Sequence, residues 1–221
     1  ATKYVKRSDI AEALAQGSVY RADATFSPDA NPESTSVDGY IGVTSQNKSW
    51  NDLIGLSTGS ASDYATNVRI AQVRDDAIED QWDDLYRGFM LFDTSSIGSD
   101  RIVDSASLTL YRTITAAQDY SVSWNLYSSN PVTNTGIVGG DFDSLGSIPF
   151  MVSGESLSVA DSYTSTEYAL NSAGRNHIEI QGITKFGTAL QEDRENAIFG
   201  DPTWVTPSYL SGGGAQYVDC I

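Results

Sequence analysis

Hydrophobic and polar residues along this chain follow the short period of β-strands more often than the longer period of helices. The most apolar stretch, Leu85–Phe92, carries apolar side chains on both faces of an extended chain. It therefore predicts a strand buried on both sides, in the middle of a sheet. A helix is the competing interpretation, but the short run and the Asp-Thr-Ser-Ser after it favour a strand. Ser105–Arg112 alternates, with Ala106, Leu108 and Leu110 on one side, and predicts a half-buried strand.

The other strand candidates are short and are separated by Gly, Pro, Asn, Asp and Ser. They are Val19–Phe26, Tyr40–Thr44, Thr66–Arg74, Tyr120–Ser128, Pro149–Val152, Leu157–Val159, Glu167–Leu170, His177–Ile180 and Ala215–Ile221. Short strands that recur about every 8–12 residues between turn signals predict a sandwich or a barrel.

Two segments have helical spacing instead. Ile10–Gln16 follows a capping-box pattern formed by Asp9 and Glu12, and Gly17 ends it. Near the C-terminus, apolar residues at helical spacing predict a second short helix within Gly182–Arg194. We therefore expect an N-terminal arm with a short helix over residues 1–18 and a single β-sandwich domain over residues 19–221.

The arm is basic, because Lys3, Lys6 and Arg7 supply three of the 13 cationic residues of the chain. A helix this short is unstable alone, so it must pack on something. It either packs on its own domain or docks on a neighbouring acidic subunit, with Lys3, Lys6, Arg7, Ile10 and Leu14 at the contact.

Composition narrows the class of protein. The 221 residues are 40% hydrophobic and 19% charged, which is typical of one large globular domain. The 29 acidic residues against 13 basic ones give a net charge of −16, which disfavours nucleic acid and anionic membranes as partners. No apolar run is long enough to predict membrane insertion. Because no secretory hydrophobic stretch opens the sequence, we expect a removed signal peptide or release by lysis or assembly, and a location on a virion or extracellular surface.

Candidate catalytic groups are few. His177 is the only histidine, and its strand-like surroundings predict a structural role. Cys220 is the only cysteine, so an internal disulfide is excluded, and we expect no zinc site because one histidine and one cysteine cannot fill a tetrahedral set of nitrogen and sulfur ligands. With 29 acids, carboxylate pairs at glycosidase spacing arise by chance. We therefore expect no enzymatic activity.

An acidic run between Asp75 and Asp84 places six carboxylates in ten residues. Calcium takes six to eight oxygen ligands, and loops at the edge of a sandwich can supply them. Because packed carboxylates repel one another, the run favours either a bound cation or a solvated loop. Asp80, Asp83 and Asp84 are the candidate ligands for a structural calcium ion.

Three tryptophans lie in polar surroundings, Trp50, Trp82 and Trp204. An exposed ring beside polar side chains can stack on the apolar face of a sugar, so these residues are candidate ligand contacts. The alternative is that they cap the ends of the core. Trp124 alternates with core residues, and we expect it to be buried.

The stretch Leu85–Tyr111 also resembles a family. The match is carried by Arg87, Leu91-Phe92-Asp93, Ser95-Ser96-Ile97, Ile102-Val103, Ser105-Ala106 and Leu108-Thr109-Leu110-Tyr111, with weaker similarity at Val37-Asp38-Gly39 and Gly182–Gly187. This pattern resembles the DNRLRE-type domains, which are jelly rolls similar to carbohydrate-binding modules. The resemblance implies an all-β, jelly-roll-like antiparallel sandwich.

Proteins of this kind serve surface layers, secreted glycan-binding proteins and phage structures. We therefore expect a non-catalytic structural or adhesion subunit of a virion or other extracellular assembly, bound to copies of itself or to other subunits. The alternative is a carbohydrate-binding module that recognises surface glycans. The final strand, Ala215–Ile221, departs from the family pattern and is a candidate for pairing with a neighbour.

Overall fold

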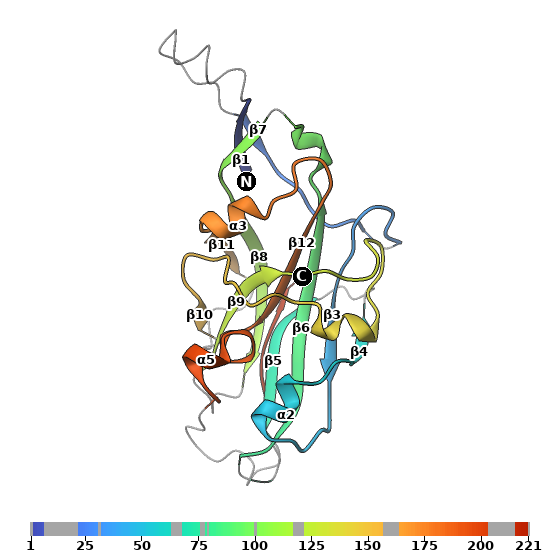
Figure 1. Ribbon diagram of the computed structural model, residues 1–221, viewed down its shortest axis with the longest axis vertical. Helices are drawn as coiled ribbons and strands as arrows, with labels where there is room; N and C mark the ends of the chain where they lie inside the picture. Colours follow the sequence, from blue (N-terminus) through green and yellow to red (C-terminus); the bar gives the residue numbers. More distant parts are fainter. Residues whose placement is uncertain are drawn as a thin grey trace.

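The structure is a computed structural model that describes residues 2–6, 22–30, 32–62, 68–75, 78, 80–99, 101–116, 122–156, 164–202 and 215–220. These residues form an antiparallel β-sandwich with a few short helices (Figure 1). The strands are β1 (Thr2–Lys6), β2 (Ala22–Ala24), β3 (Asp38–Val43), β4 (Ser60–Ser62), β5 (Val68–Asp75), β6 (Trp82–Asp93), β7 (Arg101–Ser105), β8 (Ser107–Ala116), β9 (Ser123–Ser128), β10 (Glu155–Ser156), β11 (Thr164–Ala169), β12 (Ile183–Leu190) and β13 (Ala215–Cys220). The helices are α2 (Trp50–Ile54), α3 (Ser172–Asn176), α4 (Gln191–Arg194) and α5 (Asn196–Phe199), with single 3-10 turns η1 (Ser95–Ile97) and η2 (Gly139–Asp143).

Strand β6 belongs to both layers of the sandwich. One of its edges pairs with β3. Its other edge pairs first with β5, up to Arg87, and then with β12, from Gly88 onward. The two layers diverge at this point: β12 leads to β9 and β10, whereas β5 leads to β13, β8 and β11. A separate sheet of order β2-β1-β7 stands at one end (Figure 1).

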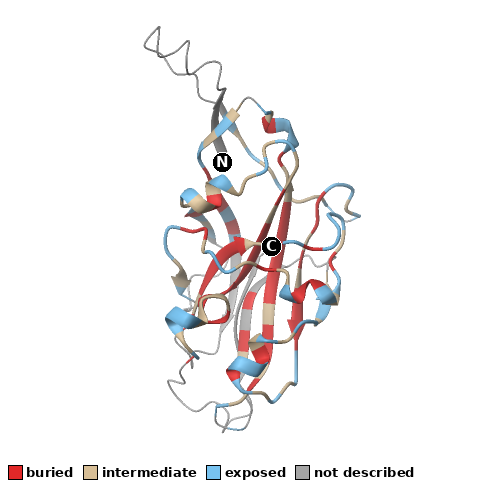
Figure 2. Cartoon of the chain, in the orientation of Figure 1, coloured by how far each residue is buried: buried red, intermediate tan, exposed pale blue. Residues whose placement is uncertain are grey.

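The two strands predicted most strongly from the sequence are confirmed. β6 is mostly buried along its length (Figure 2). Leu85, Phe89 and Leu91 on one face have no exposed surface, and Met90 on the other face is 4% exposed. β8 alternates as expected, because Leu108 and Leu110 are buried while Tyr111 is exposed. The core lies between the layers and contains the predicted buried Trp124. The prediction of an all-β antiparallel sandwich is therefore confirmed.

The helix predicted over Gly182–Arg194 is wrong for most of its length. Ile183–Leu190 is the strand β12, and only the last four residues form the helix α4. β12 pairs with β6 on one edge and β9 on the other, which satisfies its backbone hydrogen bonds on both sides. Gly187 is in close contact with the Leu145 side chain, since a Cβ there would lie 2.6 Å from Leu145 Cγ. Apolar spacing alone could not distinguish a strand buried on both faces from a helix.

The strand predicted over His177–Ile180 is also absent: the helix α3 ends just before it, His177 caps the C-terminal end of that helix, and the following residues run into a turn. Asn171 explains the helix: its Oδ1 accepts from the Gly174 N–H at 3.0 Å, and its Nδ2 donates to the carbonyls of Pro149 and Met151. Of the strand predicted over Pro149–Val152, only a single bridge between Met151 and Leu170 forms. Residues 157–159 lie outside the described residues.

Strand β13 was expected to be available to a neighbour, and this is wrong. It pairs with β5 on one edge and with β8 on the other, so it lies inside its layer. At the other end of the chain, Lys3 and Lys6 belong to β1, a strand that the sequence did not predict, which pairs with β2 and β7. Arg7, Ile10, Leu14 and the proposed boundary after residue 18 lie outside the described residues.

Candidate functional site

The tryptophans proposed to bind sugar do not present their rings to solvent where the structure describes them. Trp50 is 1% exposed and Trp82 is 2% exposed. Their rings meet nearly edge to face, with centroids 5.4 Å apart, and the Trp50 indole N–H donates to the carbonyl of Glu192. Both side chains are part of the core, because α2 folds over the start of β6. Trp204 lies outside the described residues.

Two of the three acidic side chains proposed to bind calcium, Asp83 and Asp84, have another partner. Strand pairing places Arg74 opposite Asp84, and the Arg74 guanidinium donates to both Asp84 carboxylate oxygens at 2.8 Å. Asp83 lies 3.3 Å from the same guanidinium, and Asp80 is exposed in a turn with a positive φ of 62°. Among the residues described, no three His, Cys, Asp or Glu side chains gather to hold a metal ion. Calcium binding stays a prediction.

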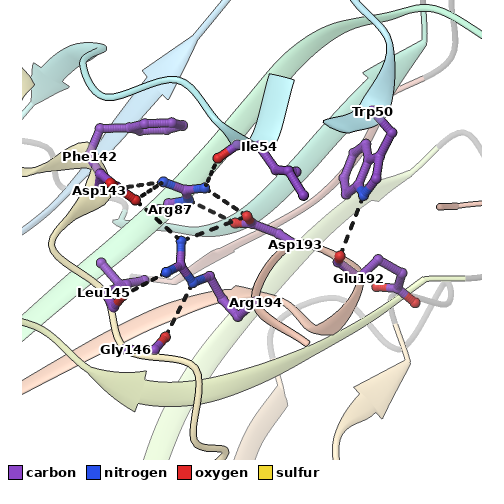
Figure 3. A network of polar contacts seen from close by, with 10 residues as sticks. All are labelled: Trp50, Ile54, Arg87, Phe142, Asp143, Leu145, Gly146, Glu192, Asp193 and Arg194. Atoms are coloured by element: carbon purple, nitrogen blue, oxygen red, sulfur yellow. Dashed lines mark hydrogen bonds and ion pairs between the residues drawn. The ribbon is translucent and has the colours of Figure 1, made fainter. Parts of the chain in front are cut away.

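The most completely buried charges form a clamp around Arg87 (Figure 3). The Arg87 guanidinium donates to both carboxylate oxygens of Asp193 at 2.7 Å, and both side chains are fully buried. It also donates to the carbonyls of Phe142 at 2.7 Å and Ile54 at 3.0 Å. Its Cζ lies 4.0 Å from the centre of the Phe142 ring. These contacts attach α2, η2 and α4 to β6, so the clamp has a structural role.

A second arginine extends the clamp. Arg194 donates to the carbonyls of Leu145 at 2.7 Å and Gly146 at 3.2 Å (Figure 3). Burial lowers the pKa of its guanidinium. Asp143 lies 3.9 Å from both Arg87 and Arg194. The two guanidinium groups therefore hold the loop around η2 by its backbone carbonyls.

Beside the clamp lies a buried group of acids. Burial raises the pKa of Glu192 to about 7, and the charges of Glu195 and Asp193 add to the shift. The Ser123 N–H donates to Glu192 at 3.3 Å, and the Tyr127 hydroxyl donates to Glu195 at 2.7 Å. Glu192 therefore loses its proton near neutral pH, and this ionisation changes the stability of this end of the sandwich.

A cleft of about 510 Å³ opens between the two layers, and its lining from β6 begins at Met90, beyond Arg87 of the clamp. This volume is in the range of ligand-binding pockets in proteins. One wall comes from β6 and β12, the opposite wall from β8, and the segment Ala24–Pro28 forms a side. Its apolar lining includes Met90, Phe92, Leu108, Leu110, Ile178 and Phe186.

Asp38 is the one charged residue among the described residues that line this cleft. It is half-buried at the start of β3. Burial raises the pKa of its carboxyl to about 6, and the negative charge of Glu33 adds to the shift. Two threonine hydroxyls of the lining are already engaged, since Thr94 and Thr184 contact each other at 2.7 Å. Asp38 is therefore the group of this cleft best placed to meet a cation.

The cleft is bordered by the edge of β8 as well as by its face. All residues from Ala106 to Tyr111 line it, whereas a strand that presents only its face would contribute every second residue. The Leu170 N–H donates to the Ala106 carbonyl, which fixes the even-numbered residues of β8 as those that exchange hydrogen bonds with β11. The backbone groups of Thr109 and Tyr111 consequently point toward the opposite edge.

Among the described residues, β13 covers that edge as far as Arg112. Within the described residues, no strand pairs with it between Leu108 and Tyr111. The sequence predicted β8 but contained no signal for its open edge. Arg87 did carry a signal, because a lone arginine in so apolar a strand needs a buried partner.

The described part of the chain contains no helix long and apolar enough to cross a membrane. His177 contacts the Lys185 carbonyl at 2.8 Å and lies against the rings of Phe150 and Phe186. The resemblance of Leu85–Tyr111 to DNRLRE-type domains stays a prediction. Comparison of the chain with protein-family models, with curated proteins and with solved structures found no match.

Proposed function

We propose that the chain is a non-catalytic structural or adhesion module of a virion or another extracellular assembly. The observation that carries this proposal is the apolar cleft beside the open edge of β8. A cleft that offers apolar side chains and strand backbone is suited to hold a partner. The clamp supports the same role, because it fixes three loops and gives the module a rigid frame.

Three of the described ionisable groups have structural partners, which supports this role. Arg87 and Asp193 are engaged with each other, and His177 is engaged with a backbone carbonyl. The net charge of −16 favours solubility and attracts basic partners.

Light scattering of the purified chain tests the proposal. We expect a species larger than a monomer, or a stable complex once a basic protein partner of the same assembly is added. Measurement with calcium and then with EDTA also tests whether calcium lies at the joint. A chain that is monomeric in both conditions and binds no such partner would contradict the proposal.

Glycan binding is the second candidate function, and Tyr111 favours it. Tyr111 borders the cleft at the edge of β8, and its side chain, on the opposite face from Leu108 and Leu110, is 54% exposed, so its ring is available to stack on a sugar beside the cleft. A glycan screen with the native chain and with Tyr111→Ala tests this role. We expect binding by the native chain alone, with equal thermal stability of the two proteins. Equal glycan binding by both would exclude Tyr111 as the sugar contact.

A further inference from the structure

The open edge of β8 lies in line with the part of β8 that pairs with β13. β13 occupies this position from Ala116 to Arg112 of β8, and the next positions along β8 face the cleft. Thr109 and Tyr111 direct an N–H and a carbonyl each toward this place. A strand placed there would extend the layer in line with β13.

The side chains around this position also suit a strand. Leu108 and Leu110 line the cleft from the core face of β8, and Met90 and Phe186 line it from the other layer. Successive side chains of a strand point to opposite faces. Every second side chain of an inserted strand would therefore enter an apolar space, and the others would lie beside the exposed Tyr111.

The negative charge at the cleft indicates a basic partner. Asp38 lines the cleft with Glu33 near it, and the whole chain carries a net charge of −16. The cationic N-terminal residues Lys3 and Lys6 are already held in β1, between β2 and β7. A basic segment from a different protein fits this site better than the same segment of a second copy.

We propose that the cleft binds an extended segment of a partner protein, which pairs with β8 at Thr109 and Tyr111. The segment has apolar residues at alternate positions and a lysine or arginine that reaches Asp38. This inference rests on the proposed function and adds to it the site at which a partner binds the module. Strand addition to an open edge combines backbone hydrogen bonds with side-chain pockets, which give specificity.

A synthetic peptide of about six residues spans the edge from Leu108 to Tyr111 with one residue to spare at each end. Valine alternates with threonine in this probe, and one central residue is lysine. Its binding to the full chain is measured by calorimetry near physiological salt, where non-specific charge attraction is screened. A peptide of the same composition in scrambled order is the control, and we expect it to bind at least about tenfold more weakly.

The role of the β8 edge is tested with two variants of one residue. Thr109→Pro removes an N–H that faces the cleft and leaves the hydrogen bonds between β8 and β11 in place. Thr109→Ala keeps that N–H. We expect the proline variant to lose binding by at least about tenfold and the alanine variant to retain it.

If Thr109→Pro fails to fold, the backbone of the probe is changed instead. N-methylation of alternate residues of the peptide removes its donors and leaves its side chains unchanged. We expect one of the two alternate methylation patterns to abolish binding to the native chain. Equal binding of the parent and of both methylated peptides would overturn strand addition.

The charge contact is tested with Asp38→Asn and with the matched control Asp201→Asn, which removes an exposed acid outside the cleft. We expect Asp38→Asn alone to weaken binding of the lysine peptide by about tenfold or more. A peptide with norleucine in place of lysine should bind both variants equally. Equal loss in both variants would overturn the role of Asp38.

Other outcomes separate this inference from the function on which it rests. A concentration-dependent dimer that Thr109→Pro abolishes would assign the cleft to a second copy and overturn the foreign partner. Failure of the peptide to bind a chain that still assembles would overturn the joint but not the proposed function. Peptide binding by a chain that neither self-associates nor joins an assembly would support the site and contradict the function.

Discussion

Replacement of Arg87 by methionine tests whether the clamp holds the sandwich together. Methionine keeps much of the apolar stem beside Phe142 and removes the guanidinium. The change deletes two hydrogen bonds to Asp193 and two to the carbonyls of Phe142 and Ile54. It also leaves the Asp193 carboxylate fully buried, with the Arg194 guanidinium 3.9 Å away as the remaining cation.

The size of the effect follows from this burial. Removal of one partner of a buried ion pair costs about 3–5 kcal/mol, because the remaining charge keeps its desolvation penalty. We expect Arg87→Met to lower the free energy of unfolding by about 4 kcal/mol. The double variant Arg87→Met with Asp193→Leu removes both charges and leaves two carbonyls without a donor. It should be more stable than the single variant by about 2 kcal/mol.

Urea denaturation followed by circular dichroism measures both values. The slope of the transition should stay the same, because the surface exposed on unfolding is almost unchanged. Arg175→Met is the matched control, since Arg175 is partly exposed and donates to the Leu170 carbonyl at 2.9 Å. We expect it to cost no more than about 1 kcal/mol.

Two results would refute this reasoning. If Arg87→Met cost no more than the control, the buried pair would not stabilise the fold. If the double variant were less stable than Arg87→Met by as much as the single variant Asp193→Leu is less stable than the native chain, the two side chains would act independently and the clamp would not be a unit.

Three further predictions concern the same end of the molecule. The folded state raises the pKa of Glu192 from 4.5 to about 7, so this group lowers the free energy of unfolding as pH rises between these values. Urea denaturation of the native chain and of Glu192→Gln is compared at pH 5 and pH 8. The free energy of unfolding should fall by about 1–3 kcal/mol less in Glu192→Gln than in the native chain. Gly139→Ala should lower the melting temperature, because a Cβ at residue 139 would lie 2.2 Å from the Gly59 carbonyl oxygen. Gly140→Ala has open space and should not, and equal melting temperatures would contradict the close contact. Trp50→Ala should cost about 3–5 kcal/mol in the same denaturation assay, and an unchanged stability would contradict its burial.

The elements that the sequence predicted well are those with one dominant pattern. β6 was recognisable because both of its faces are apolar, and β8 because its faces alternate. β12 was mistaken for a helix because its apolar residues happen to match helical spacing. α3 was missed because the Asn171 side chain, which contacts residues far away in the chain, stabilises it. Tertiary contacts decided the elements that local pattern could not.

The candidate site was less predictable. Loop tryptophans in polar sequence looked exposed, but Trp50 and Trp82 pack on each other across the fold. Asp83 and Asp84 looked like cation ligands because Arg74, their partner, lies in another strand. Asp38 and the open edge of β8 depend on which strands become neighbours and where their pairing stops, and single-sequence patterns do not encode this.

The position of β6 in both layers has a consequence for how the chain reaches its folded state. β6 pairs with β3, which precedes it, and with β12, whose first residue Ile183 lies opposite Asp93, about 90 residues earlier. Contacts between residues so distant in sequence are slow to form, because the loop between them must first be closed. During synthesis, the edge of β6 from Gly88 onward therefore stays without its partner strand until β12 has left the ribosome. The folding rate of this module should depend more on how β6 captures β12 than on any local hairpin.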